Sequence, residues 1–178
     1  MRKLSNPWIW LRRLRQRRGY GVHSPFAFRF LTEVVYEQGA FYDFEVLDRQ
    51  LRPLQRLRIR RLLHMLFRLS NFVQPERIYV PAEASLEASY LQAGCKHATL
   101  SPLETPDCNA ATLCFVRQPS EVSTETLGPR SVLVLDRLQS HKAWFRSLPA
   151  TVFFDLHDIG VAIFDNAYNR QYYTINFE

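Results

Sequence analysis

The chain has 178 residues, of which 47% are apolar and 13% aromatic. This composition predicts one folded domain with a sizeable core and excludes an intrinsically disordered protein. No stretch reaches the roughly 18 apolar residues of a membrane span, and the N-terminus lacks the apolar core of a secretory signal, so we expect a cytoplasmic protein. Because Cys95, Cys108 and Cys114 lack paired spacing, we expect buried, reduced thiols.

The net charge of +6 is concentrated in the first residues of the chain. Residues 1–32 contain eight basic residues and no acidic residue, so residues 33–178 carry a net charge of −2. We assign residues 1–22 to a basic arm with a predicted helix. The candidate polyanion contacts are Arg12, Arg13, Arg15, Arg17 and Arg18.

Two interpretations of the arm remain open. Tryptophans interleaved with arginines are typical of nucleic-acid binding by phosphate pairing and base stacking, or of contact with an anionic membrane surface. The other interpretation is a solvated helix whose tryptophans pack on the body or on a second copy of the chain in a homo-oligomer.

Residues 23–76 are predicted to form further helices. Ser24 and Pro25 are typical of an N-cap and a first helical position, and the apolar stripe after them predicts a helix that stops before Gly39. Two more helices are expected before the strand region, with Pro53 as a break in the first of them. The predicted helices of this part span residues 25–38, 44–57 and 59–69.

After residue 76 the apolar pattern changes to short strands that alternate with helices. The strands are predicted at residues 78–80, 98–100, 112–116, 131–135, 151–155, 161–164 and 172–177, and the helices at 86–92 and 143–148. Residues 165–169 are expected to join the last two strands as an antiparallel hairpin. The pattern predicts an α/β fold with a largely parallel sheet and the N-terminal helices packed on it.

Motifs spread over nearly the whole chain resemble those of one bacterial family. They are residues 19–28 (GYGVHSPFAF), 66–69, 72–75, 85–91, 132–136 with 143–144, and the strand pair 154–156 and 159–161. As a set they are similar to class I S-adenosylmethionine-dependent methyltransferase-like proteins, of the O-methyltransferase-like type found in Bacteroidetes. The resemblance implies a shortened, three-layer Rossmann-like methyltransferase core in residues 77–178, with helices 23–76 packed on it as part of one domain.

The resemblance also implies a pocket for S-adenosylmethionine at the carboxyl ends of the strands. The residues of this chain at the matching positions are Ala82, Glu83, Ser85, Ser101, Glu104, Arg117 and Asp136. The family has two glycines in the turn after its first strand, whereas residues 81–87 of this chain contain none. Three acidic positions of the family are also replaced in this chain. Ser101 stands at the position that holds the ribose, and Arg117 and Arg137 stand at two later acidic positions.

These replacements predict a weakened cofactor site, because a cation near the sulfonium group of S-adenosylmethionine disfavours binding. We therefore expect a methyltransferase-like protein with a degenerate site and a non-catalytic or binding role. An active small-molecule O-methyltransferase with an atypical cofactor loop is an alternative. In a second alternative, the arginines recruit a phosphate or carboxylate ligand instead. A third alternative is binding of nucleic acid or a membrane surface through the arm.

The other polar residues show no catalytic pattern. We interpret His23 as a capping or packing residue, and the histidines lack the spacing of metal ligands, so we expect no metal. No Gly-x-Ser-x-Gly motif surrounds a serine. His157 and Asp158 are predicted to pair in a loop at a strand end, and the tyrosines 172–173 to pack at a sheet edge.

Overall fold

A computed structural model describes residues 24–103, 110–175 and 177, without the side chains of residues 54–58. The predictions for the arm (residues 1–22) and for His23, Glu104 and Cys108 lie outside the described residues. Among the described helices, none is both long and apolar enough to cross a membrane.

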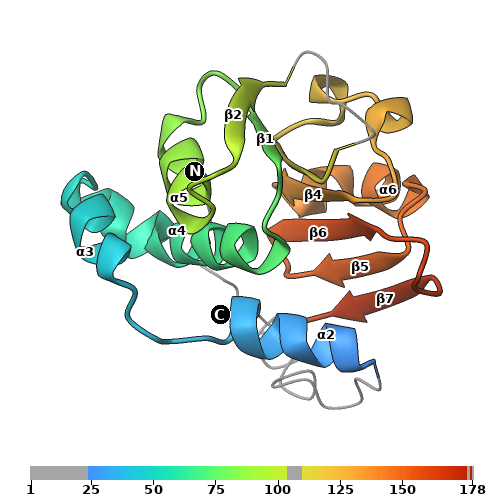
Figure 1. The fold of residues 1–178 in the computed structure, drawn as a ribbon, viewed down its shortest axis with the longest axis horizontal. Helices are drawn as coiled ribbons and strands as arrows, with labels where there is room; N and C mark the ends of the chain where they lie inside the picture. Colours follow the sequence, from blue (N-terminus) through green and yellow to red (C-terminus); the bar gives the residue numbers. More distant parts are fainter. Residues whose placement is uncertain (1–23, 104–109, 176, 178) are drawn as a thin grey trace.

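A seven-stranded sheet with the order β2-β1-β3-β4-β6-β5-β7 forms the centre of the fold (Figure 1). The strands are β1 Arg77–Val80, β2 Thr99–Pro102, β3 Thr112–Val116, β4 Ser131–Asp136, β5 Val152–Asp155, β6 Ile159–Phe164 and β7 Gln171–Thr174. Strands β1 to β4 are parallel, β6 is antiparallel to both β4 and β5, and β7 is parallel to β5. The predicted α/β class with a mostly parallel sheet is confirmed.

Helices cover both faces of this sheet (Figure 1). The helical elements are α2 Pro25–Phe30, η2 Leu31–Val35, α3 Tyr42–Arg49, α4 Pro53–Val73, α5 Ser85–Gly94, η3 Pro119–Glu121, η4 Thr124–Thr126 and α6 Leu138–Ser147. Successive strand side chains point to opposite faces, so Leu113 packs in one core with α2, α4 and α5, and Cys114 packs in a second core with α6. The continuous apolar runs of β3, β4 and β6 therefore follow from burial on both faces.

The predicted boundary between the third and fourth helices is wrong. Helix α3 ends at Arg49, and Pro53 is the first residue of α4, which continues to Val73. Proline restricts the residue before it to extended backbone and suits the first helical position, where its missing N–H is not needed. The predicted N-cap is confirmed, since the Ala27 backbone N–H donates to Ser24 Oγ at 3.3 Å.

The antiparallel hairpin at the end of the chain joins different strands from those predicted. Strands β5 and β6 form it through residues 156–158, whereas β7 crosses to the far side of β5 and forms the sheet edge. All six residues of β6 are buried, so this strand occupies an inner position between β4 and β5. Strand β7 is half-buried along its length, which suits an edge.

Candidate functional site

The turn at the carboxyl end of β1 forms without a left-handed residue. Its hydrogen bond runs from the Ala84 N–H to the Pro81 carbonyl at 2.9 Å. Among the described residues other than glycine, positive φ angles occur at Gln74, Arg137 and His157, and none occurs in this turn. The absence of glycine therefore does not strain the backbone here. Side chains instead occupy the surface over which a ligand would approach the main chain.

Three of the predicted site residues line one cavity beside this turn. Ala82, Ser85 and Ser101 border a depression of about 500 Å³ between β1, β2 and α5. This volume lies within the range of small-molecule sites, roughly 300–1,000 Å³. Val80, Leu100 and Pro102 supply apolar walls.

An ion pair lies on the other side of β1, at the point where the strand order reverses. The chain passes from β1 to β2 on one side and returns to β3 on the other, and ligands of α/β sheets bind outside the carboxyl ends of the strands at such a point. Arg117, which follows β3, directs Nη2 to Glu87 Oε1 of α5 at 3.0 Å. The two side chains are 25% and 11% exposed. The Arg117 backbone N–H donates to Glu121 Oε2 at 2.7 Å, so carboxylates of the chain already engage this residue.

The other predicted site residues that the structure describes do not line the depression beside β1. Asp136 is buried at the end of β4 and lies opposite Ile159 of β6. Glu83 is exposed in the turn. The structure thus brings Ala82, Ser85 and Ser101 together and places Arg117 in an ion pair with α5.

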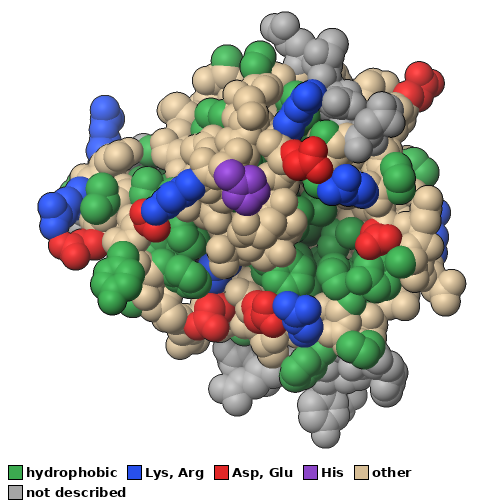
Figure 2. Space-filling model, in the orientation of Figure 1, with side chains coloured by type: hydrophobic (Ala, Val, Ile, Leu, Met, Phe, Trp, Pro, Cys, Tyr) green, Lys and Arg blue, Asp and Glu red, His purple; other side chains and the backbone are tan. Residues whose placement is uncertain are grey.

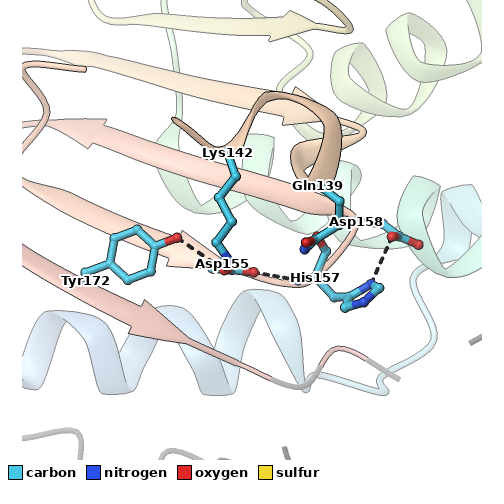
Figure 3. A network of polar contacts seen from close by, with 6 residues as sticks. All are labelled: Gln139, Lys142, Asp155, His157, Asp158 and Tyr172. Carbon is cyan, nitrogen blue, oxygen red and sulfur yellow. Dashed lines mark hydrogen bonds and ion pairs between the residues drawn. The ribbon is translucent and has the colours of Figure 1, made fainter. Parts of the chain in front are cut away.

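A polar network at the carboxyl end of β5 connects the sheet to α6 (Figure 3). The fully buried Asp155 accepts hydrogen bonds from Lys142 Nζ at 2.6 Å, from the Tyr172 hydroxyl at 3.2 Å and from the His157 backbone N–H at 3.0 Å. The predicted His157–Asp158 loop pair is confirmed, with Nδ1 and Oδ1 2.9 Å apart. Because these three groups of the chain already occupy the carboxylate of Asp155, we interpret the network as a structural one that stabilises the end of β5.

The structure also forms a polar cluster that the sequence did not predict. The carboxylate of Asp48, on α3, accepts hydrogen bonds from Arg60 Nε at 2.7 Å and the Tyr90 hydroxyl at 2.6 Å. His64 Nε2 lies 3.0 and 3.2 Å from its two oxygens. The His64 ring stacks on Phe44 with the ring centroids 3.7 Å apart. One carboxylate therefore joins α3, α4 and α5.

Burial and hydrogen bonding shift the pKa values of Asp48 and His64 in opposite directions. Burial raises the pKa of Asp48, but hydrogen bonds from Tyr90 and His64 together with nearby positive charge bring that pKa below its ordinary value. Burial, with the nearby charges of Arg60 and Arg68, lowers the pKa of His64 below its ordinary value, although Asp48 acts to raise it. We therefore expect an ionised carboxylate beside a neutral imidazole at neutral pH. The helical spacing of Arg60 and His64 is the only local signal of this site, because Asp48 joins it through tertiary packing.

Thiol and metal chemistry find no support in the part of the chain that the structure describes. Cys95 and Cys114 are free and buried, as expected, and burial raises the pKa of Cys114 to about 12. Such a thiol does not ionise at neutral pH. In the same residues no three histidine, cysteine or carboxylate side chains are arranged to hold a metal ion.

The surface and the comparisons with known proteins add little to this site. Acidic, basic and apolar side chains are mixed over the face shown in Figure 2, without a broad patch of one sign among the coloured residues. Neither the protein-family models nor the curated proteins include a match to this chain.

Proposed function

We propose that this chain is a shortened, Rossmann-like methyltransferase-like protein whose S-adenosylmethionine site has degenerated, and that it serves a non-catalytic or binding role. The observation that carries the proposal is the Arg117–Glu87 ion pair at the reversal of strand order. A sulfonium ligand would have to approach the guanidinium of Arg117, and this charge is held in place by Glu87.

The sheet supports the methyltransferase-like part of the proposal. The family resemblance implies a closing strand pair at residues 154–156 and 159–161, and β5 and β6 pair antiparallel through these residues. The turn after β1 supports the loss of the cofactor site. Exposed Ala82 and Glu83 occupy it, where glycines would leave the backbone open to the cofactor.

Titration calorimetry with S-adenosylmethionine and with its demethylated product tests the proposal. We expect no saturable heat, which corresponds to a Kd above about 1 mM. The variant Arg117→Ala removes the cation and frees Glu87, so we expect it to gain weak, measurable binding of S-adenosylmethionine.

A matched control is Arg130→Ala, which breaks a second arginine–glutamate pair of the same 3.0 Å length between Arg130 and Glu76. This pair joins the amino-terminal ends of β1 and β4, so its loss leaves the carboxyl ends of the strands, where the cofactor would bind, unchanged. Micromolar binding of S-adenosylmethionine to the unaltered chain would contradict the proposal of a degenerate site.

An active small-molecule O-methyltransferase with an atypical cofactor loop is the second candidate, favoured by the depression of about 500 Å³ that Ala82, Ser85 and Ser101 line. In that case S-adenosylmethionine would enter from the β2 side of β1, away from Arg117. This candidate predicts that S-adenosylmethionine binding is lost in Ser85→Trp and unchanged in Arg117→Ala. That result distinguishes it from the first candidate.

A third candidate is binding of nucleic acid or an anionic membrane through the basic arm. Its support is the charge distribution, since the basic excess belongs to residues 1–32 and the described surface in Figure 2 is of mixed sign. The full chain and a variant with glutamine at Arg12, Arg13, Arg15, Arg17 and Arg18 are compared for binding to DNA, RNA and anionic vesicles at several salt concentrations. Equal binding by both chains rules the arm out.

A further inference from the structure

Two adjoining cavities lie among the N-terminal helices and share no lining residue with the depression beside β1. The larger, of about 840 Å³, is bordered by α3, α4 and the segment before α3. The smaller, of about 270 Å³, lies between the end of η2 and α4. Both are bordered by Gln38, Gly39, Arg61 and His64, so they form one double cavity.

One side of α4 supplies the polar wall of the double cavity. Arg61, His64 and Arg68 follow one another at three- and four-residue spacing, which places them on the same side of the helix. Arg68 is 6% exposed, and its Nε donates to the Val34 carbonyl at 2.8 Å. Its terminal Nη groups have no hydrogen-bond partner among the described residues, and they remain available to a ligand in the cavity that Arg68 lines.

The lining of the smaller cavity has an excess of one positive charge. Arg61 and Arg68 border the smaller cavity together with a single carboxylate, that of Glu37. Burial lowers the pKa of Arg68 to about 10, so this guanidinium is still charged at neutral pH. In the larger cavity Arg60 is paired with Asp48, and Glu45 is paired with Arg49 outside the cavity lining. A ligand with one negative charge would balance the excess.

His64 adds a hydrogen-bond acceptor to this wall. Its Nε2 faces the two oxygens of Asp48, and a carboxylate accepts only, so Nε2 carries the proton. Nδ1 is then an acceptor, and no described residue donates to it. The apolar walls of the larger cavity, Ala40, Phe41 and Phe44, suit a flat hydrocarbon body.

We propose that the double cavity binds a small organic carboxylate that also carries a hydroxyl or N–H donor. Arg61 and Arg68 pair with the carboxylate, since the guanidinium fork matches its two oxygens. His64 accepts the donor, and the aromatic wall covers the body of the ligand. This site is independent of the proposed loss of the cofactor pocket, because it uses none of the residues at the carboxyl edge of the sheet.

Calorimetry on the full chain with 4-hydroxybenzoate, a small acid of this class, tests the proposal. We expect saturable one-to-one binding with a Kd below about 1 mM. Binding should weaken about tenfold or more with 4-hydroxybenzamide, which lacks the charge, and to a smaller extent with benzoate, which lacks the donor. Inorganic phosphate should bind more weakly than 4-hydroxybenzoate, because it lacks the apolar body. No saturable heat with 4-hydroxybenzoate, or equal affinity for phosphate, overturns the proposal.

Three variants separate this site from nonspecific attraction to a basic protein. Arg61 is exposed, so Arg61→Gln should fold normally, and we expect it to weaken 4-hydroxybenzoate binding about tenfold. Glu37→Gln removes the opposing carboxylate and should tighten binding. Arg130→Gln, directly before β4 and outside the lining of both cavities, should leave the affinity unchanged. An equal loss in Arg130→Gln and Arg61→Gln, or weaker binding in Glu37→Gln, contradicts the assignment.

Discussion

Gly94 shows how one residue controls the distance between two helices. A Cβ at this position would lie 2.2 Å from the carbonyl oxygen of Phe67, a backbone atom of α4 that cannot rotate away as the end of a side chain can. A helix pattern in the sequence does not reveal which glycine faces a neighbouring helix. The role of Gly94 in the contact between α4 and α5 is a property of the tertiary structure.

We expect Gly94→Ala to lower the free energy of unfolding by about 1–3 kcal/mol, since the helices must separate to admit the methyl group. Gly39→Ala is the matched control. Its new Cβ would meet the Oε1 atom of Glu37, the end of a flexible side chain that can rotate away. Urea denaturation of both variants checks the difference. Equal stability of Gly94→Ala and Gly39→Ala would show that α5 adjusts freely on α4.

At the scale of elements, the polar cluster around Asp48 connects α3 to α4 and α5. Helix α3 lies to one side of the sheet in Figure 1, where it packs against α4 and α5. Its exposed face includes Tyr42 and Val46. The hydrogen bonds of Asp48 add a polar anchor to the packing of Phe44 and Leu47, which this helix buries in the core.

This cluster predicts a dependence of stability on pH. The pKa of His64 is lowered in the folded state, so the unfolded chain takes up a proton on this ring first, near its ordinary pKa of about 6.5. The His64 contribution is complete above that pH and decreases below it. Asp48, whose pKa is also lowered, contributes above its unfolded pKa, and this contribution is lost at more acidic pH as the folded carboxylate protonates.

Urea denaturation between pH 8 and pH 5, limits chosen to span about 1.5 units either side of the free histidine pKa, measures this slope. We expect the free energy of unfolding to fall below about pH 6.5 and the fall to diminish in His64→Gln. His141→Gln, on α6 and outside the Asp48 cluster, is the control for replacing a histidine with glutamine. An unchanged slope in His64→Gln would assign the pH dependence to other groups.

Most helices and strands follow from local pattern, but their boundaries and partners depend on neighbours. The buried strand at Ser131–Asp136 was predicted almost to the residue, because its apolar run is continuous. Helix α6 begins at Leu138, five residues before the predicted start, after a left-handed Arg137 that the sequence does not reveal. Pro53 opens a helix of 21 residues, whereas the sequence pattern predicted it as a break within the preceding helix.

At the scale of the whole molecule, the strand order divides the sheet into a protected centre and a thin edge. Strands β4 and β6 pair along six residues each and are buried throughout. Strand β2 lies at the edge, with no residue buried. Stability against local opening should therefore decrease from the centre of the sheet toward β2.

Amide hydrogen exchange checks this expectation. We expect the amides of β4 and β6 to exchange at least about 100-fold more slowly than those of β2, because opening an edge strand exposes far less apolar surface. Strand β7, which also lies at an edge but is half-buried, should be intermediate. Equal protection of β2 and β4 would mean that the sheet opens only as a whole.

The sequence by itself determined the α/β class, the positions of most helices and strands, and the glycine-free turn after β1, since these depend on the spacing of residues near one another in the chain. The tertiary structure decided the order of the last three strands. It also brought together side chains far apart in sequence, such as Arg117 with Glu87, 30 residues away, and Tyr90 with Asp48, 42 residues away. Local periodicity cannot predict such contacts, because they form only when separate elements pack against one another.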